Sequence, residues 1–305
     1  MVSRYLIIGG TGLVGKALIT HLLGRGDHIA IGTRAPFRST LKDERVLRLP
    51  LDKSEWEKAA KEKPFDGVVN LAGQSIFSGR WTNETKNAIL QSRISTTNML
   101  VNWMETATVP PKVLVNASAV GYYGPSDNDV FTEDSTPGFK DFLAEVSGAW
   151  EEAALRANDF GVRVVLARLG IVLSREGGAL PRLVLPYRMR VGGTIGSGKQ
   201  WVSWVHIDDV VKLLTFMLDH QELKGAVNVT APAPVTMREL GKAVAAQLGT
   251  HSSLPVPAFA IKAVLGEAGN LILTGQKVVP AKATAEEFEF EYRTIEDALE
   301  NLLAK

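Results

Sequence analysis

The stretch that decides the fold of this chain is Tyr5-Leu6-Ile7-Ile8-Gly9-Gly10-Thr11-Gly12-Leu13-Val14-Gly15. Its apolar start predicts a short buried strand, and a helical pattern follows the glycines. In such a turn the first glycine allows the tight bend, the second lets the backbone approach a pyrophosphate, and the third packs the helix against the strand. We therefore expect a dinucleotide to lie over residues 9–15. The alternative is a structural turn that binds nothing.

Short apolar runs alternate with helical patterns along the first half of the chain. Strands are expected at residues 5–8, 28–33, 46–51, 67–71, 113–118 and 162–169, and helices at residues 16–23, 56–61, 83–105 and 142–158. Strands that alternate with helices form βαβ units and a mainly parallel sheet. Because the crossovers of such sheets are right-handed, the expected fold is α/β, a Rossmann-type doubly wound parallel sheet.

The pattern changes at residue 170, where a segment rich in glycine and proline begins. We predict that residues 1–170 plus about 201–230 form the dinucleotide-binding domain. About 171–200 plus 231–305 then form a smaller C-terminal α+β cap over the carboxyl edge of the sheet, where open α/β sheets bind ligands. Within the second half, Asp208 or Asp209 is expected to cap a helix that covers residues 210–218.

The residues after the second predicted strand indicate which cofactor is bound. A site for NAD usually places Asp or Glu there, about 20 residues after the glycine turn, to accept a hydrogen bond from the ribose 2′-hydroxyl. This chain has Thr33-Arg34 instead, with Arg38 close behind. A guanidinium matches a phosphate in charge and in forked geometry, which favours NADP (NADPH) over NAD. The alternative is that Arg34 is a solvated surface arginine.

Composition excludes several classes of site. The formal net charge is +1 over 305 residues, so there is no broad electrostatic footprint for nucleic acid or acidic lipid. The chain has no cysteine, which excludes disulfides, thiolate catalysis and cysteine-based zinc sites, and the spacing of its five histidines predicts no metal site. No apolar run reaches the ~18 residues of a membrane span. We expect a cytoplasmic monomer or homodimer that binds a small-molecule substrate, not nucleic acid or a membrane.

Several motifs together resemble one family. They are Asn70-Leu71-Ala72-Gly73, Arg80-Trp81, Ser92-Arg93 with Thr96-Thr97, Val120-Gly121-Tyr122-Tyr123-Gly124, Trp150-Glu151, Gly177-Gly178-Ala179 and Gly196-Ser197-Gly198. The chain resembles atypical extended short-chain dehydrogenase/reductases, an NAD-dependent epimerase/dehydratase-like family of unassigned substrate with a C-terminal domain of unknown function. Some members are called cell-division-inhibitor-like. The matches cover nearly the whole chain.

This resemblance implies a role for individual residues. Thr33 and Arg34 would face the adenosine 2′-phosphate. Leu71, Ala72 and Gly73 would line the cofactor, although Leu71 and Ala72 also suit core packing. The remaining residues that the resemblance implies are Arg93 reaching toward the cofactor, Ser118 beside the nicotinamide, and Arg168 with Leu169 at the end of the next strand. The alternative for Arg93 is a salt-bridged helix residue.

The usual catalytic pair of short-chain dehydrogenases is missing from this sequence. That pair is Tyr-x-x-x-Lys, which places both side chains on one face of a helix, where the lysine lowers the pKa of the tyrosine. The five tyrosines are followed four positions later by Gly9, Ser126, Asp127, Val191 and Glu296. We therefore predict that Ser118, Tyr122 and Tyr123 are catalytic, with a phenol that donates to a substrate carbonyl. The alternative is that one tyrosine packs in the core and the other lines the pocket.

Two functional hypotheses follow from these patterns. The first is an NADP(H)-dependent oxidoreductase or epimerase whose substrate lies between the dinucleotide-binding domain and the cap. The second is a non-catalytic NADP(H)-binding sensor or scaffold, which the missing Tyr-x-x-x-Lys pair favours.

Overall fold

The computed structural model describes residues 2–34, 43–77, 79–138, 141–251 and 255–304. Its centre is a seven-stranded sheet in the order β12-β7-β5-β4-β1-β2-β3, with all neighbouring strands parallel. The strands are β1 (Arg4–Ile8), β2 (His28–Thr33), β3 (Val46–Pro50), β4 (Gly67–Asn70), β5 (Val113–Ala119), β7 (Arg163–Leu169) and β12 (Gly225–Val229). The predicted doubly wound parallel sheet is confirmed.

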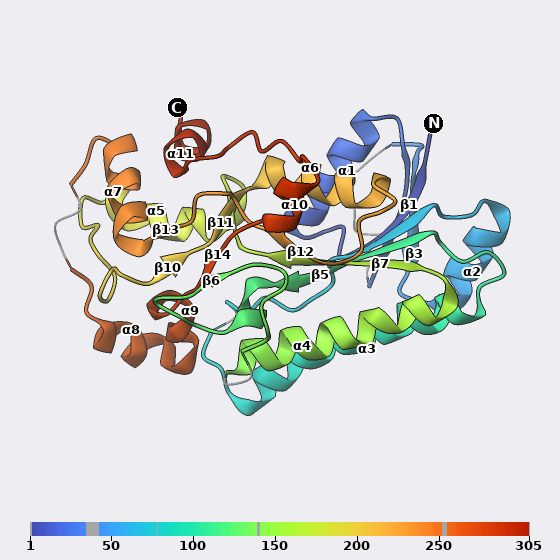
Figure 1. Ribbon diagram of the computed structural model, residues 1–305, viewed down its shortest axis with the longest axis horizontal. Coiled ribbons are helices and arrows are strands. Elements are labelled where there is room, and N and C mark those ends of the chain that lie inside the picture. The colour runs from blue at the N-terminus through green and yellow to red at the C-terminus, as the bar shows by residue number, and fades with distance from the viewer. Residues whose placement is uncertain (1, 35–42, 78, 139–140, 252–254, 305) are drawn as a thin grey trace.

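Helices cover both faces of this sheet (Figure 1). The helices α1 (Leu13–Gly24) and α6 (Ile207–Asp219) pack together in one hydrophobic cluster, and α2 (Lys53–Glu62), α3 (Asn83–Thr106) and α4 (Phe142–Leu155) lie on the opposite side. Successive residues of β1 serve the two clusters in turn, since Ile7 packs in the first and Leu6 and Ile8 pack in the second. A strand that is covered on both faces has no polar side, which explains the continuous apolar run in the sequence.

Most of the remaining elements lie beyond the carboxyl ends of the sheet strands, at the end of the molecule where Figure 1 shows α5, α7, α8 and α11, whereas residues 156–160 directly precede β7 and residues 281–285 pack beside β12. The helices are α5 (Leu180–Arg188), α7 (Met237–Gln247), α8 (Ala258–Leu265), α9 (Asn270–Leu273), α10 (Ala281–Ala285) and α11 (Ile295–Leu303), with 3₁₀ turns η2 (Val120–Tyr123), η3 (Arg156–Phe160) and η4 (Gly266–Gly269). The short strands are β6 (Val130–Phe131), β8 (Ile171–Ser174), β9 (Gly177–Gly178), β10 (Trp201–Val202), β11 (Trp204–His206), β13 (Val235–Thr236) and β14 (Lys277–Val278). They pair as β11-β8-β9, β10-β13 and β14-β6.

A third hydrophobic cluster holds this end of the molecule together. It is built around Leu173, Trp204 and Leu299, from β8, β11 and α11. The glycine- and proline-rich segment contributes α5, which the sequence did not predict, with one proline in the first turn where the missing N–H costs nothing. The predicted division of the chain into two domains stays a prediction.

The start of α6 differs from the sequence prediction, which placed a capping aspartate there. The cap is His206, whose Nδ1 accepts a hydrogen bond from the Asp208 backbone N–H at 3.1 Å. Asp209 is buried instead and accepts from the backbone N–H groups of Glu291 and Tyr292 at 2.9 and 3.0 Å. The prediction was wrong because Asp209 is used to satisfy backbone donors of the segment that leads into α11.

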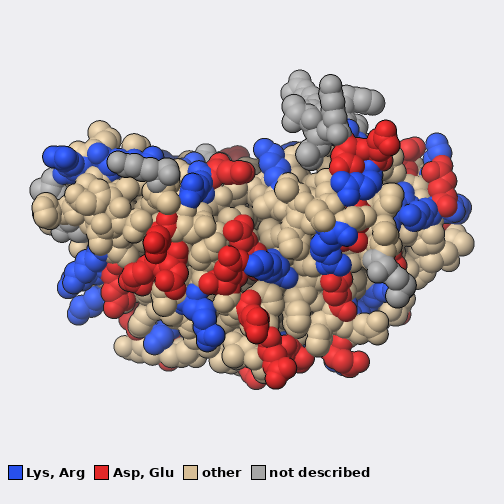
Figure 2. Space-filling model, turned by 90° about the horizontal axis from the view of Figure 1, so that it is seen from above, with Lys and Arg blue, Asp and Glu red and all other residues tan. Residues whose placement is uncertain are grey.

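The face drawn in Figure 2 shows no concentration of one charge among the described residues. On the face drawn in Figure 2, lysines and arginines alternate with aspartates and glutamates over the described residues. Among the helices within the described ranges, none combines the length and the apolar character that crossing a membrane requires.

Candidate functional site

The glycine turn has the geometry of a phosphate-binding loop. Gly9 has φ of +79°, and the Gly12 N–H donates to the Gly9 carbonyl at 3.0 Å. A Cβ at Gly9 would lie 2.7 Å from the Leu71 backbone, and one at Gly15 would overlap the Gly9 carbonyl oxygen. The helix α1 starts directly after Gly12 without a side-chain cap or an acidic residue in its first turn. Its N–H groups and positive dipole end are therefore available to an anion.

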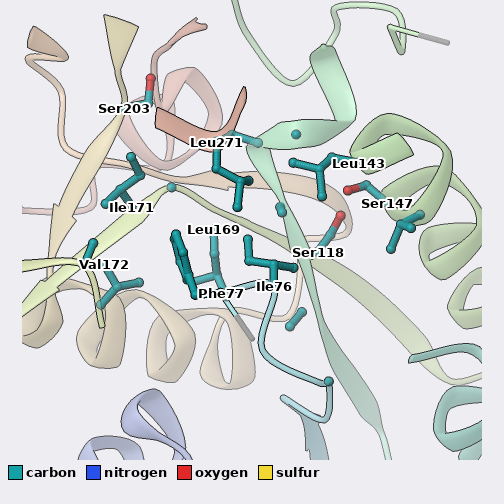
Figure 3. Close-up of a pocket in the computed structure, with 18 of the residues that line it drawn as sticks. Ile76, Phe77, Ser118, Leu143, Ser147, Leu169, Ile171, Val172, Ser203 and Leu271 are labelled. Atoms are coloured by element: carbon teal, nitrogen blue, oxygen red, sulfur yellow. The ribbon is translucent and has the colours of Figure 1, made fainter. Parts of the chain in front are cut away.

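A cavity of about 490 Å³ opens from this turn along the carboxyl ends of the sheet strands (Figure 3). The predicted residues that line it are Gly9, Gly12, Leu13, Val14, Gly15, Leu71, Gly73, Arg93, Ser118 and Leu169. The structure thus brings together ten residues from five separate segments of the chain. This convergence follows from the parallel topology, because all these strands end at the same edge.

The other predicted residues lie outside this lining. Gly10 is buried and packs against Ile19, whereas Thr11 and Arg34 are exposed. The remaining residues outside the lining are Thr33, Ala72, Tyr122, Tyr123 and Arg168. Arg38 lies outside the described residues. The cofactor contacts predicted for Thr33 and Arg34 stay predictions.

Arg93 is a partly buried cation on the wall of the cavity. Burial lowers the pKa of its guanidinium to about 10, so the group still carries its charge near neutral pH. It donates to the backbone carbonyls of Gln74 and Ile89 at 3.1 and 2.9 Å and lies 5.0 Å above the ring of Trp150. Within the described ranges it pairs with no carboxylate. An arginine held in this way is suited to bind an anionic ligand.

Ser118 belongs to a buried hydrogen-bonded network. Its hydroxyl lies 2.6 Å from Oε1 of Glu151, and Arg168 reaches both oxygens of that carboxylate, with Nε and Nη2 each 2.8 Å away. The side chains of Glu151 and Arg168 are only 6% and 5% exposed. Burial alone lowers the pKa of Arg168, but the hydrogen bonds and charge of Glu151 outweigh that effect and raise it. The strand register explains the geometry, because Ser118 on β5 lies directly beside Arg168 on β7.

The two tyrosines that the sequence proposed as catalytic hold Arg168 in place. The Tyr123 hydroxyl accepts from Nη1 of Arg168 at 2.9 Å and donates to Oδ1 of Asn228 at 2.7 Å. Burial raises the pKa of Tyr123 to about 12, which makes this phenol a weak acid. The ring of Tyr122 lies 3.5 Å from the guanidinium carbon of Arg168. The catalytic roles of both tyrosines stay predictions, and the structure gives each ring a supporting contact outside the cavity lining.

Sequence reasoning gave no role to several residues that shape this site. In the sequence Glu151 appears only as part of the Trp150-Glu151 motif, and no motif includes Ser147, which lines the cavity. Their spacing is the signal that was available, since residues four apart share one face of a helix. Ser147 and Glu151 on α4 follow this spacing, and both face the end of β5.

The outer part of the cavity is apolar and aromatic. Trp81 and Phe142 meet edge to face with centroids 5.2 Å apart, and Ile76, Phe77 and Leu271 lie nearby in the lining (Figure 3). The segment that carries α8 and η4 is joined to this wall by polar contacts. Lys86 on α3 forms an ion pair with Glu267 at 2.6 Å, and Arg80 donates to the backbone carbonyls of Ala263 and Val264. The cavity is therefore bounded on one side by the ends of the sheet strands and on the other by η4 and α9.

Comparisons with known proteins agree with this geometry. The model of the NAD dependent epimerase/dehydratase family matches residues 5–230, and that of a domain of unknown function, DUF1731, matches residues 256–302. The epimerase family protein YfhF of Bacillus subtilis is 40% identical over 297 residues, which cover 97% of this chain and 96% of the relative. The chloroplastic epimerase family protein SDR39U1 homolog of Arabidopsis thaliana is 42% identical over 306 residues, covering 97% of this chain and 86% of the relative.

Solved structures match over the whole chain as well. The human epimerase family protein SDR39U1, crystallised with NADPH, is 34% identical with a TM-score of 0.87, and the match covers 98% of each chain. The Bordetella bronchiseptica enzyme WbmG in complex with NAD is 18% identical with a TM-score of 0.78, covering 100% of this chain and 94% of the other. That second likeness concerns the fold alone.

Proposed function

Since this chain belongs to the NAD dependent epimerase/dehydratase family, we propose that it is an NADP(H)-dependent oxidoreductase or epimerase that acts on a small organic molecule. The observation that carries this proposal is the single cavity that joins the glycine turn at Gly9–Gly15 to the aromatic wall at Trp81 and Phe142. One end of this cavity suits a pyrophosphate and the other suits an apolar substrate. We also keep the cytoplasmic location as part of the proposal.

The preference for NADP(H) over NAD(H) is supported by two observations. Arg34 is exposed directly after β2, where a ribose 2′-phosphate would need a cation, and no acidic side chain follows Thr33 there. The human relative was crystallised with NADPH. The guanidinium of Arg93, which lies on the cavity wall, adds a cation for the phosphates.

Different residues of the cavity would hold the cofactor and surround the reacting atoms. The N-terminus of α1 and Arg93 would bind the anionic part of the cofactor, and Leu71 and Leu169, which line the cavity, would pack against it. When bound, the cofactor supplies a hydride donor or acceptor at its nicotinamide. Ser118, oriented by Glu151, would then lie next to the reacting atoms, and the apolar wall at Phe142 excludes water from them.

The second candidate is a non-catalytic NADP(H)-binding sensor or scaffold. It is favoured by the missing Tyr-x-x-x-Lys pair and by Tyr123, whose hydroxyl is already bonded to Arg168 and Asn228. Incubation with NADPH and a panel of aldehydes, ketones and quinones separates the two candidates. Oxidation of NADPH that depends on Ser118 supports the enzyme, whereas tight NADPH binding without reduction of any compound supports the sensor.

The cofactor preference has its own experiment, in which Kd is measured for NADPH and NADH by calorimetry. We expect Arg34→Ala to weaken NADPH by roughly tenfold or more, because a charge-assisted hydrogen bond contributes about 1.5–3 kcal/mol. NADH has no 2′-phosphate, so its Kd should change less than twofold. Arg156→Ala, another exposed arginine outside the cavity lining, is the matched control. Equal losses for the two cofactors would refute the 2′-phosphate assignment.

A further inference from the structure

The Ser118 hydroxyl is committed as a donor before any ligand binds. We propose that Ser118 acts toward bound ligands only as a hydrogen-bond acceptor, so that the site selects an N–H or O–H donor at this point. The inference rests on the proposed function, because it concerns the same cavity.

Its two contacts with Arg168 hold Glu151 as a carboxylate. Each of its oxygens accepts an N–H from Arg168 at 2.8 Å, and a bidentate contact of this kind requires a carboxylate. Glu151 therefore has no proton to give. The 2.6 Å contact with Ser118 can exist only if the serine is the donor. A hydroxyl has a single hydrogen and two lone pairs, so the lone pairs of Ser118 remain for the cavity.

The groups that hold Arg168 and Glu151 form a rigid arrangement. Arg168 is fixed by Glu151, by the Tyr123 hydroxyl and by the ring of Tyr122, and its Nη1 also lies 3.5 Å from the Glu133 carbonyl. To turn its proton toward a ligand, Ser118 would have to leave a buried carboxylate oxygen without that hydrogen bond. Such a loss costs more than one neutral hydrogen bond returns. The hydroxyl of Ser118 is therefore not free to rotate toward a carbonyl.

Ser147 is a second serine of the cavity, and its proton is not committed in the same way. This serine lines the same cavity, and Figure 3 shows the two side chains directed toward the same part of it. Within the described ranges the Ser147 hydroxyl makes no hydrogen bond, although the residue is only 3% exposed. It can donate or accept. The two hydroxyls line the same cavity, and only that of Ser118 has its proton committed to a carboxylate.

Two groups can donate the hydrogen bond that Ser118 accepts. One is the carboxamide N–H of the nicotinamide, and the other is a hydroxyl or amine of the substrate. A ligand carbonyl at the same place would set lone pairs against lone pairs, which is unfavourable in a cavity with an apolar wall. The experiment has one arm for each source.

The first arm compares NADP⁺ with its 3-acetylpyridine analogue, in which a methyl group replaces the carboxamide NH₂. If the carboxamide is the donor, the wild type binds NADP⁺ about three to ten times more tightly than the analogue, the span of one hydrogen bond. The ratio should fall to about one in Ser118→Ala and stay at its wild-type value in Ser95→Ala, which removes an exposed hydroxyl outside the cavity lining. Unfolding midpoints of both variants confirm that they are folded.

The second arm compares 2-naphthol with 2-methoxynaphthalene, two planar probes suited to the aromatic wall, on the protein saturated with NADP⁺. If the substrate is the donor, the naphthol binds about three to ten times more tightly in the wild type, and this preference also disappears in Ser118→Ala alone. A preference lost from either arm supports the inference. Ratios that Ser118→Ala leaves unchanged in both arms, or a preference for the methyl compounds, would overturn it. A wild type that binds no NADP⁺ would instead refute the proposed function.

Discussion

The buried ion pair between Glu151 and Arg168 makes a strong prediction about stability. Glu151→Gln keeps the shape of the side chain but removes the charge that neutralises Arg168. The guanidinium is 5% exposed, and its close acceptors would then be neutral: the glutamine carbonyl oxygen and the Tyr123 hydroxyl. Breaking one partner of a buried pair costs about 3–5 kcal/mol, because the other charge stays buried without compensation. Since whole domains are stable by about 5–15 kcal/mol, this loss is a large fraction of the total.

The assay is thermal unfolding followed by circular dichroism, with the apo protein at one fixed concentration. At roughly 2–4 °C per kcal/mol for chains of 150–250 residues, the midpoint should fall by about 6–20 °C. The matched control is Glu291→Gln, which removes a carboxylate from the exposed pair with Lys212, whose two side chains are 47% and 43% exposed. This change should cost less than about 1 kcal/mol. A Glu151→Gln protein that unfolds within 2 °C of the control, a margin on the order of 1 kcal/mol, would refute the reasoning.

Three further outcomes are expected. Gly15→Ala should weaken NADPH binding by more than about tenfold, because its Cβ would overlap the Gly9 carbonyl oxygen, while Gly148→Ala, which meets nothing within 4 Å, should leave the Kd unchanged. Burial lowers the pKa of His206 below 6.5, so between pH 7.5 and about 5 the unfolded chain binds more protons than the folded one. The unfolding midpoint should therefore fall as the pH drops through this range, and it should fall less in His206→Asn. Tyr123→Phe should destabilise the protein by about 1–3 kcal/mol and leave the NADPH Kd within twofold, whereas a loss of turnover with unchanged stability would show that this phenol is catalytic.

The parts of the fold that could be predicted are those that local sequence determines. The strand at His28–Thr33 was predicted with its observed bounds, because a run of apolar residues between polar ends has few other solutions. The glycine turn was predictable for a similar reason, since backbone contacts at Gly9 and Gly15 leave no room for a Cβ. The segment of α5 carries two prolines within nine residues, and these hide a helix from any periodic pattern.

The network behind Ser118 could not be predicted in this way, because it depends on which strands are neighbours. Arg168 stands at the end of an otherwise apolar run, and a charged residue is almost never fully buried without a partner. That rule signals that a partner exists without saying which one. Only the pairing of β5 with β7, together with the position of α4 above them, brings Glu151 to both Arg168 and Ser118.

The helix α4 shows how the same fold supports a different site. In the short-chain dehydrogenases that the chain resembles, a helix face carries a tyrosine and a lysine four residues apart. Here the face toward the cavity carries Leu143, Ser147 and, four residues further, Glu151. A phenol and an ammonium are thus replaced by a neutral hydroxyl in the cavity and a carboxylate beneath it. That carboxylate is neutralised by Arg168 and accepts a hydrogen bond from Ser118. The charged group of this helix therefore orients a serine hydroxyl, whereas the lysine of the usual pair acts on a tyrosine. Any chemistry at this site must therefore take its proton from a group other than a lysine-activated phenol.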